Sequence, residues 1–286
     1  MKIVLGKIIV RYFKNWPLLW RLVPVIQKKS RSYSGKNIPK IVRTRYGFKI
    51  NVNLGDFIGR HIYLHGDYED YVSRIFLKLL EPGSNVIDIG ANIGYFSLLS
   101  SSIVGKTGQV FSFEASPAIY NRLKSNILLN NIDNVYAYSN AIGDEECNIK
   151  FFEANDTHLG LSSLRDLGLQ ESKIIDVKMF TLNKIAPQFP FINLIKVDVE
   201  GAEMKVFRGI ESIIDRDLPF IIFEVTDYML RELGSSKSEL LRFLENKNYL
   251  LYKICDKTLS SIPEREEQFN AVAIPITKLE VVSSLS

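Results

Sequence analysis

The stretch that decides the fold reads Val86-Ile87-Asp88-Ile89-Gly90-Ala91-Asn92-Ile93-Gly94-Tyr95-Phe96. An apolar run with a carboxylate near its end precedes a loop with two glycines, which predicts a buried strand that turns sharply into a helix. In a doubly wound sheet, ligands bind at the carboxyl ends of the parallel strands, and glycines there let a ligand approach the backbone closely. We therefore expect a small-ligand site around residues 88–94.

Asp88 at the end of this strand indicates the ligand. A dinucleotide-binding loop reads Gly-x-Gly-x-x-Gly, because its middle glycine and the following helix N-terminus accept a pyrophosphate. Here the pattern is Asp-x-Gly-x-Asn-x-Gly, and a carboxylate repels a pyrophosphate at short range but attracts an ammonium or a sulfonium. S-adenosylmethionine carries both groups and is the expected ligand. The simpler alternative for Asp88 is a carboxylate that caps a helix or a turn.

Length and composition bound the fold class. A chain of 286 residues, nearly half of them apolar, accommodates one α/β domain plus a small appendage. Two cysteines, Cys147 and Cys255, are too few for a disulfide framework, and with the three histidines they do not supply a Cys/His metal cluster. This composition fits a reducing, cytoplasmic setting.

The N-terminal segment differs in charge from the rest of the chain. Thirteen Lys and Arg residues precede residue 50 without any acidic residue, whereas the remaining 23 face 32 acidic residues. Trp16 and Trp20 lie among these basic residues, and charges interrupt the apolar runs well before the roughly 20 residues that a transmembrane helix needs. We expect residues 1–40 to form a basic amphipathic segment, and residues 1–35 to contact the anionic inner face of a membrane peripherally. A helix packed on the main domain is the alternative.

Beyond residue 40, the sequence pattern predicts a small hairpin and a helix, followed by one main domain. A small hairpin at the entrance and a lid helix are expected over residues 41–81, the main domain over 82–278 and a tail over 279–286. Strands alternating with helices predict a mostly parallel sheet covered by helices on both faces. After the opening stretch, strands are expected at 109–114, 134–139, 191–198, 220–225, 249–254 and 269–274, with two more near a sheet edge at 147–152 and 174–180; helices are expected at 71–80, 96–104 and 117–130.

Two further strand ends carry candidate ligand-binding residues. Glu114 ends the strand after the opening one, 26 residues beyond Asp88, where a carboxylate can accept both ribose hydroxyls of a nucleoside. Asn140 and Ala141 follow the third strand and offer amides and a small apolar wall suited to an adenine. A structural role explains Asn140 equally well.

A second group of charged residues lies in the stretch 195–203. Central parallel strands are normally almost entirely apolar, yet Lys196, Asp198 and Glu200 alternate here with apolar residues and therefore share one side of the strand. Burying such charges unpaired costs several kcal/mol, so we expect them to pair within a site. A purely structural ion pair is the alternative. Glu203 opens the following helix, where either a site role or a favourable interaction with the helix dipole explains it.

With these motifs the chain resembles the FkbM-type S-adenosylmethionine-dependent methyltransferases. The paired signatures at 88–94 and 196–203 are specific to that family in combination, although the first alone marks only the wider superfamily. The matching elements lie at 66–69, 86–97, 110–117, 123–131, 141–144, 181–183, 195–203 and 223–225. The resemblance implies a class I, Rossmann-like methyltransferase fold with a seven-stranded sheet, and O-methylation of sugars, lipid-linked glycans or polyketide-type hydroxyls.

Methyl transfer from a sulfonium to an alcohol oxygen gives these residues candidate roles. The donor pocket would be formed by Glu69, Asp88, Gly90, Asn92, Gly94, Tyr95, Phe96, Glu114, Asn140 and Ala141. Asp198 is the candidate base or hydrogen-bond acceptor, Lys196 would keep it ionised or orient the acceptor, and Glu200 is a further catalytic carboxylate. Glu203 and Glu224 are candidates for binding substrate or a metal. The same carboxylates suit Mg²⁺, which would lower the pKa of the acceptor hydroxyl, and the sequence leaves both routes open.

Two other functions stay open from the sequence. The basic N-terminus and the Lys-Asp-Glu set also fit an RNA 2′-O-methyltransferase, but the net acidic remainder counts against nucleic acid as a partner. A non-catalytic adaptor that retains S-adenosylmethionine would bind the donor without any acceptor. For the enzyme, a small-molecule or glycan acceptor is expected. Its specificity should depend on the hairpin region and on the loop at 153–173, where Asp156, His158 and Arg165 have no readable role.

Overall fold

The computed structural model describes residues 25, 28, 30–153, 173–256 and 258–285. The expected amphipathic segment 1–40 and the loop at 153–173 therefore lie largely outside the described residues. Among the helices within those ranges, none combines the length and the apolar character that a membrane span requires.

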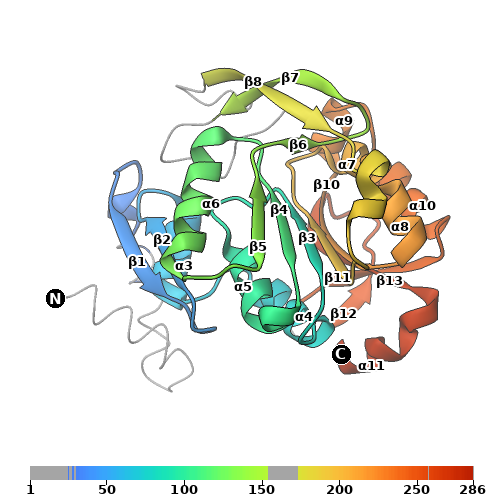
Figure 1. Ribbon diagram of the computed structural model, residues 1–286, viewed down its shortest axis with the longest axis horizontal. Helices are drawn as coiled ribbons and strands as arrows, with labels where there is room; N and C mark the ends of the chain where they lie inside the picture. The colour runs from blue at the N-terminus through green and yellow to red at the C-terminus, as the bar shows by residue number, and fades with distance from the viewer. Residues whose placement is uncertain (1–24, 26–27, 29, 154–172, 257, 286) are drawn as a thin grey trace.

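The central sheet contains eight strands (Figure 1). They are β3 (Val86–Ile89), β4 (Val110–Phe113), β5 (Val135–Tyr138), β9 (Leu194–Val197), β10 (Phe220–Thr226), β11 (Tyr249–Ile254), β12 (Leu259–Ser261) and β13 (Gln268–Pro275). Their order across the sheet is β12-β11-β13-β10-β9-β3-β4-β5. The strands from β10 to β5 run parallel, whereas β13 lies antiparallel between β10 and β11.

The expected mostly parallel sheet is thus confirmed, with one strand more than the expected seven. The additional strand is β12, which pairs antiparallel with β11 at the edge of the sheet. With three residues it is too short to show an alternating pattern in the sequence.

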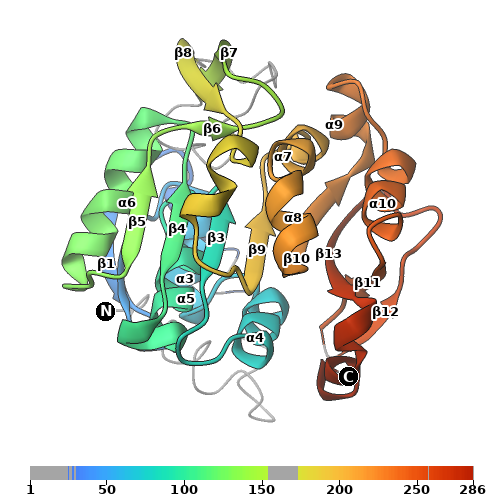
Figure 2. The same ribbon diagram turned by 45° about the vertical axis from the view of Figure 1, so that its right-hand side comes forward.

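Helices cover both faces of this sheet, as predicted (Figures 1 and 2). One face carries α4 (Asp70–Leu79), α5 (Tyr95–Val104) and α6 (Pro117–Leu129), and the other carries α7 (Glu203–Gly209), α8 (Glu211–Asp217) and α10 (Lys237–Glu245). Their apolar residues form one buried cluster on each face. Within β3, Val86 packs in the first cluster and Ile87 and Ile89 in the second, because successive side chains of a strand point to opposite faces. The remaining short helices are η2 (Arg31–Tyr33), η3 (Gly105–Thr107), η5 (Asn183–Gln188), α9 (Asp227–Glu232), η6 (Ile276–Val281) and α11 (Val282–Leu285).

A hairpin and one helix precede the main sheet. The hairpin strands β1 (Pro39–Arg43) and β2 (Lys49–Asn53) pair antiparallel, and α3 (Phe57–His65) follows them. The sequence pattern predicts a helix at 71–80 in this region but none at the position of α3. The helix begins at Asp56, whose side chain accepts a hydrogen bond from a backbone N–H of the first turn, and ends at Gly66 in the left-handed conformation. These two capping residues are the sequence signal from which α3 could have been predicted.

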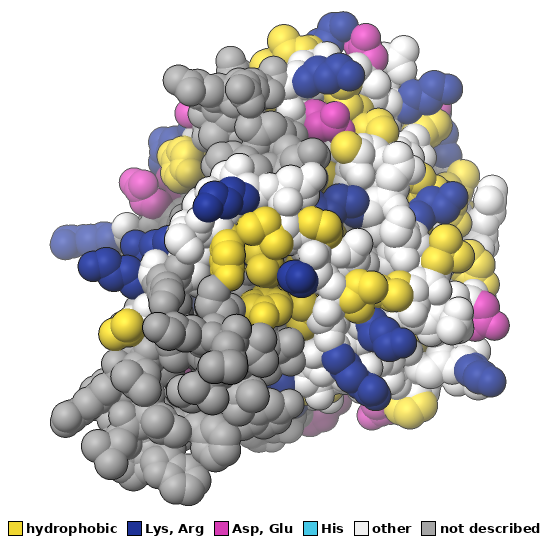
Figure 3. Space-filling model, turned by 90° about the vertical axis from the view of Figure 1, so that its left-hand side faces the viewer, with side chains coloured by type: hydrophobic (Ala, Val, Ile, Leu, Met, Phe, Trp, Pro, Cys, Tyr) yellow, Lys and Arg dark blue, Asp and Glu magenta, His cyan; other side chains and the backbone are white. Residues whose placement is uncertain are grey.

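The basic character of the N-terminal part continues into this hairpin. Lys40, Arg43 and Lys49 are exposed, and so is the apolar side chain of Ile41. Figure 3 shows the side of the molecule that carries the hairpin, where Lys and Arg side chains are spread around hydrophobic ones. The described part of the basic segment therefore presents positive charge to solvent.

A second, three-stranded sheet lies above the ends of β4 and β5 (Figures 1 and 2). Its order is β6 (Ala141–Ile142), β8 (Lys173–Phe180) and β7 (Cys147–Glu153), with β7 and β8 antiparallel. The prediction that the strands at 147–152 and 174–180 lie near an edge of the main sheet is therefore wrong. Alternation identifies a strand but does not identify its neighbour, so the sequence could not place this pair.

Candidate active site

A cavity opens at the carboxyl ends of the parallel strands, where this kind of sheet binds ligands. Its wall includes residues from the loops after β5, β4 and β3, namely Asn140, Ala141, Glu114, Asn92 and Gly90. It continues along α5 with Tyr95 and Phe96. It also includes Lys196 of β9, Asp198 and Glu200 of the loop after β9, Glu224 of β10, and Glu69, which directly precedes α4. The structure thus brings most of the expected donor and acceptor residues into one cavity.

Glu114 holds the loop that follows β3. The backbone N–H groups of Asn92 and Ser116 each donate to one of its carboxylate oxygens, both at 2.9 Å. Each oxygen keeps a second lone pair, so Glu114 can also accept hydrogen bonds from ribose hydroxyls. Burial raises the pKa of Glu114 to about 7, because the two backbone hydrogen bonds only partly offset the loss of water.

Gly90 lies in the loop after β3, which we call the donor loop, and packs closely against the loop after β9. Its φ is +81°, and a Cβ atom at this position would lie 1.8 Å from the carbonyl oxygen of Asp198. Only glycine fits there, so the two loops are fixed against each other. Gly94 does not line the cavity; it precedes α5 and packs against Leu123 of α6.

Asp88 lies beneath the donor loop and is absent from the cavity wall. Its Oδ2 accepts a hydrogen bond from Ser97 Oγ at 2.6 Å, and Ser97 Oγ accepts one from Ser112 Oγ at 2.8 Å. Its Oδ1 is buried without a hydrogen-bond partner among the described residues. Burial raises the pKa of Asp88, and the ammonium of Lys196 on the neighbouring strand β9 partly offsets this. Asp88 can therefore act on the cavity through its charge rather than by contact.

Lys196 is the centre of the charged part of the cavity wall, with Asp198, Glu200 and Glu224; we call this part the acceptor end, after the role predicted for it from the sequence. Its Nζ donates to Asp198 Oδ2 at 2.8 Å and lies 4.8 Å from the centroid of the Phe96 ring. The side chain is only 5% exposed. Burial alone would lower the pKa of Lys196, but the nearby carboxylates of Asp198, Asp88 and Glu69 outweigh it and raise the pKa above its ordinary value. Lys196 is therefore a permanent positive charge among the carboxylates.

Three glutamates share this acceptor end with Asp198. Burial, followed by the charge of Asp198, raises the pKa of both Glu69 and Glu224 to about 7. Glu200 and Glu224 each place one oxygen within 4.8 Å of an oxygen of Asp198 and of each other. One oxygen of Glu69 is buried without a hydrogen-bond partner in the described part of the chain. The cavity wall therefore carries several acceptors for hydroxyl or ammonium groups of a ligand.

Backbone strain is concentrated in the same wall. Six described non-glycine residues adopt positive φ, and three of them line the cavity: Glu69 at 43°, Asn92 at 50° and Glu200 at 53°. Such conformations cost about 1–3 kcal/mol each and persist only where the surrounding structure holds them, which is commonly at ligand sites.

Glu203 faces the protein backbone instead of the cavity. Its Oε1 accepts hydrogen bonds from the backbone N–H groups of Val199 and Gly201, both at 3.2 Å, and the residue is 1% exposed. Burial raises the pKa of Glu203 to about 8. These contacts support the structural alternative, in which Glu203 stabilises the loop at the start of α7.

Aromatic residues that the sequence analysis did not assign complete the cavity. Phe113 of β4, Phe151 of β7 and Tyr68 line it. The ring of Tyr68 lies edge-on to Tyr95, with centroids 5.9 Å apart. Phe113 directly precedes Glu114, so its place at a strand end was available from the sequence. Phe151 reaches the cavity only through the second sheet, which the sequence did not reveal.

The strand order and this cavity define a class I S-adenosylmethionine-dependent methyltransferase. The residues fit the cofactor: Glu114 suits the ribose, the aromatic walls suit the adenine, and the acceptor oxygen of Glu69 suits the ammonium group. The chain belongs to the FkbM methyltransferase family, because the family model described as Methyltransferase FkbM domain matches residues 88–251.

Individual relatives are similar over most of the chain. Methyltransferase 1 of Beauveria bassiana is 27% identical over 216 residues, which cover 68% of this chain and 80% of that protein. The hexuronic acid methyltransferase AglP of Haloferax volcanii is 26% identical over 190 residues, which cover 63% and 71%. Among solved structures, methyltransferase FkbM from Methylobacillus flagellatus KT aligns with a TM-score of 0.45 and 12% identity, over 88% of this chain and 59% of that chain. The family match and the two sequence relatives confirm that this is a methyl-transferring enzyme.

Proposed function

We propose that the enzyme is an O-methyltransferase that acts on a hydroxyl of a sugar, glycan, glycolipid or related metabolite. The observation that carries this proposal is the group of carboxylates around the buried Lys196 ammonium, at the acceptor end of the cavity. Carboxylate oxygens accept hydrogen bonds from hydroxyls, so several of them in one wall suit an acceptor with several hydroxyl groups. We assign this binding to Glu200 and Glu224, since Glu69 suits the ammonium group of the donor.

We propose that Asp198 is the base that accepts the proton of the acceptor hydroxyl. When bound, S-adenosylmethionine would supply a methyl group to an aligned oxygen: the carbon–oxygen bond forms in line as the carbon–sulfur bond breaks, and the sulfur leaves as a neutral thioether. The Lys196 ammonium holds Asp198 Oδ2 at 2.8 Å, which leaves Oδ1 to accept the hydroxyl proton. Positioned general bases contribute about 10²–10⁴-fold to a rate. Lys196 keeps its own proton, so its role is to orient Asp198 and to keep it ionised.

A hydroxyl suits this cavity better than a carboxylate as the methyl acceptor. One ammonium, Lys196, faces the carboxylates of Asp198 and Glu200 and the carboxyl groups of Glu69 and Glu224. An additional carboxylate on the acceptor would be repelled by this group, whereas a neutral hydroxyl would not. The relative named hexuronic acid methyltransferase supports a sugar as the acceptor class, but because a hexuronic acid carries both hydroxyls and a carboxylate, it does not distinguish between the two acceptors.

We favour direct proton transfer to Asp198 over a route through Mg²⁺. Oxygens of Asp198, Glu200 and Glu224 lie within 4.8 Å of one another, a spacing that suits a divalent ion. However, the Lys196 ammonium already contacts Asp198, and because its side chain is only 5% exposed, little water screens its repulsion of a second cation. Methyl transfer is therefore expected not to require Mg²⁺, and adding Mg²⁺ after EDTA treatment should not change its rate. Loss of transfer in EDTA with recovery in Mg²⁺, but not in Zn²⁺, would support the metal route instead.

The proposal is tested with isotopically labelled S-adenosylmethionine and a cell extract that is separated into lipid, polysaccharide, RNA and small-molecule fractions. We expect label in a sugar-containing fraction, in a form that resists mild alkali, because a methyl ether survives conditions that cleave a methyl ester. Label in RNA would support the nucleic-acid alternative. Donor binding without label in any fraction would support the non-catalytic alternative.

A further inference from the structure

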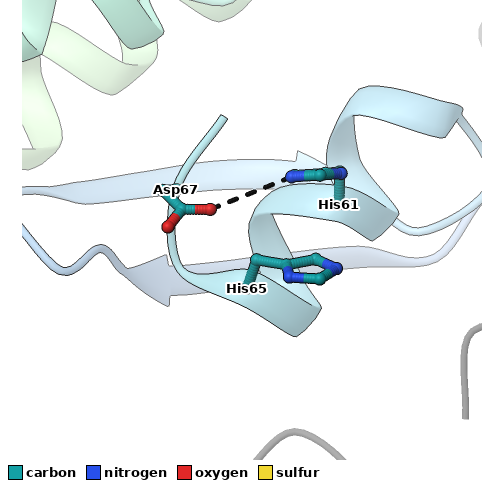
Figure 4. A group of neighbouring side chains, drawn as sticks. All are labelled: His61, His65 and Asp67. Atoms are coloured by element: carbon teal, nitrogen blue, oxygen red, sulfur yellow. Dashed lines mark ion pairs between the residues drawn. The ribbon is translucent and has the colours of Figure 1, made fainter. Parts of the chain in front are cut away.

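Three side chains that can ligate a metal ion converge at the C-terminal end of α3, outside the catalytic cavity (Figure 4). His61 and His65 are four residues apart and therefore lie on the same face of this helix, one turn from each other. Their imidazole rings are stacked, with centroids 4.3 Å apart and planes inclined by 21°. Gly66 then ends the helix in the left-handed conformation, with φ of 82°, and Asp67 follows it beside the two rings.

The three ligating groups are close enough to share one ion. One nitrogen or oxygen of each of His61, His65 and Asp67 lies within 4.8 Å of the others, and His61 Nε2 lies 3.8 Å from Asp67 Oδ1. In a tetrahedral zinc site, bonds of about 2.0–2.1 Å place the ligand atoms roughly 3.3 Å apart. Small rotations of the imidazole rings would close the remaining gap. The His61 side chain is 34% exposed, which gives an ion access from solvent.

Arg45 supports the carboxylate from outside this group. Its Nη1 lies 3.1 Å from Asp67 Oδ2, and its Nε donates to the backbone carbonyl of His65 at 2.9 Å. Asp67 has a side chain only 3% exposed, so this ion pair fixes which of its oxygens faces the rings. A charged group that orients a ligating carboxylate in this way is a common feature of metal sites.

We propose that His61, His65 and Asp67 bind a divalent transition-metal ion, with Zn²⁺ as the best match. Two imidazoles and one carboxylate suit zinc, whereas Mg²⁺ and Ca²⁺ prefer oxygen ligands alone. Three protein ligands leave a fourth position for water or another ligand. This set of two histidines and a carboxylate differs from the Cys/His cluster that the composition of the chain excludes.

A bound ion would also act on the catalytic cavity. Asp67 precedes Tyr68 and Glu69, both of which line the cavity. The ring of Tyr68 also lies edge-on to His61, with centroids 6.0 Å apart. The ion would thus tie α3 to the segment that presents two residues to the acceptor end, and so order that segment.

The test measures metal binding by the full chain after EDTA treatment, with Zn²⁺ followed by calorimetry and Co²⁺ by visible absorption. We expect one Zn²⁺ per chain, no comparable uptake of Mg²⁺, and a Co²⁺ absorption band typical of a site with nitrogen ligands. His61→Gln, His65→Gln and Asp67→Asn should each weaken Zn²⁺ binding at least tenfold. His158→Gln and Cys255→Ser each remove another imidazole or thiol that could bind Zn²⁺, so they serve as the matched controls and should bind as the wild type does.

Circular dichroism of the metal-free variants separates a lost ligand from a lost fold. If one histidine variant does not fold, the other decides the outcome. Absence of Zn²⁺ binding by the wild-type chain, or equal affinity in the wild type and in a folded His65→Gln variant, would overturn the proposal.

Discussion

Replacing Lys196 with Met tests whether one buried ammonium keeps the acceptor end of the cavity ionised. Methionine retains most of the apolar stem of lysine, so the change mainly removes charge. It leaves Asp198, Asp88, Glu69 and Glu224 without the cation that compensates them. Breaking a buried ion pair by removing one partner typically destabilises a protein by about 3–5 kcal/mol. This total includes the loss of the contact between Lys196 Nζ and the Phe96 ring.

The loss should also depend on pH. With Lys196 present, the pKa of Glu69 and of Glu224 is already raised to about 7, against an ordinary value of 4.5. Without the ammonium these pKa values rise further, so the folded variant retains protons that the unfolded chain releases. Stability then falls as pH rises, and because the folded wild type keeps the same protons below about pH 7, the deficit should grow mainly between pH 6.5 and pH 8.

Urea denaturation of the wild type and of Lys196→Met at pH 5, 6.5 and 8 measures this loss. Lys150→Met is the matched control, because Lys150 pairs with Asp176 at 2.7 Å while both side chains are about two-thirds exposed. The control should leave the free energy of unfolding nearly unchanged. A loss in Lys196→Met that is as small as in the control, or the same at all three pH values, would refute this account of the site.

Three further predictions concern individual residues. Gly90→Ala should destabilise the protein by several kcal/mol in thermal denaturation, because its Cβ would meet the Asp198 carbonyl. Gly105→Ala has open space around the new Cβ, so it should cost only the strain of its glycine-type backbone conformation (φ 64°, ψ −164°), about 1–3 kcal/mol. Glu114→Gln should weaken S-adenosylmethionine binding about tenfold in calorimetry, and unchanged affinity would exclude a ribose contact. The wild type should lose stability as pH rises from 4.5 to 8, because in that range Glu203 is protonated in the folded protein but ionised in the unfolded chain. Glu203→Gln should remove this loss, and parallel pH profiles of the two proteins would contradict the prediction.

The parts of the site that the sequence revealed depend on local constraints. A buried strand, a turn that needs positive φ and a following helix leave a recognisable pattern over residues 86–96, and the structure has β3 and α5 there. The alternating charges at Lys196 and Asp198 likewise indicated a pair, which the structure shows at 2.8 Å. In both cases the sequence spacing alone fixes which side chains meet.

The features that the sequence did not reveal depend on contacts between distant segments. Asp88 and Glu203 belong to the motifs but do not line the cavity, because Ser97 and the loop before α7 provide closer partners. Phe151 lines the cavity because β7 pairs with β8 in a separate sheet. His61 and Asp67 meet because α3 ends at Gly66. The sequence pattern did not predict α3.

The most direct test of the proposed function is the paired measurement of turnover and donor binding in Asp198→Asn. The substitution preserves shape but removes the carboxylate that we assign to the hydroxyl proton. Asp176→Asn, in the exposed pair with Lys150, is the matched control. The substrate for the turnover assay is the cell-extract fraction that takes up label from S-adenosylmethionine. We predict that turnover by Asp198→Asn is at least about 100-fold lower than that of the wild type. Its dissociation constant for S-adenosylmethionine should stay within about twofold of the wild-type value. Turnover at the wild-type rate in this variant would contradict the account.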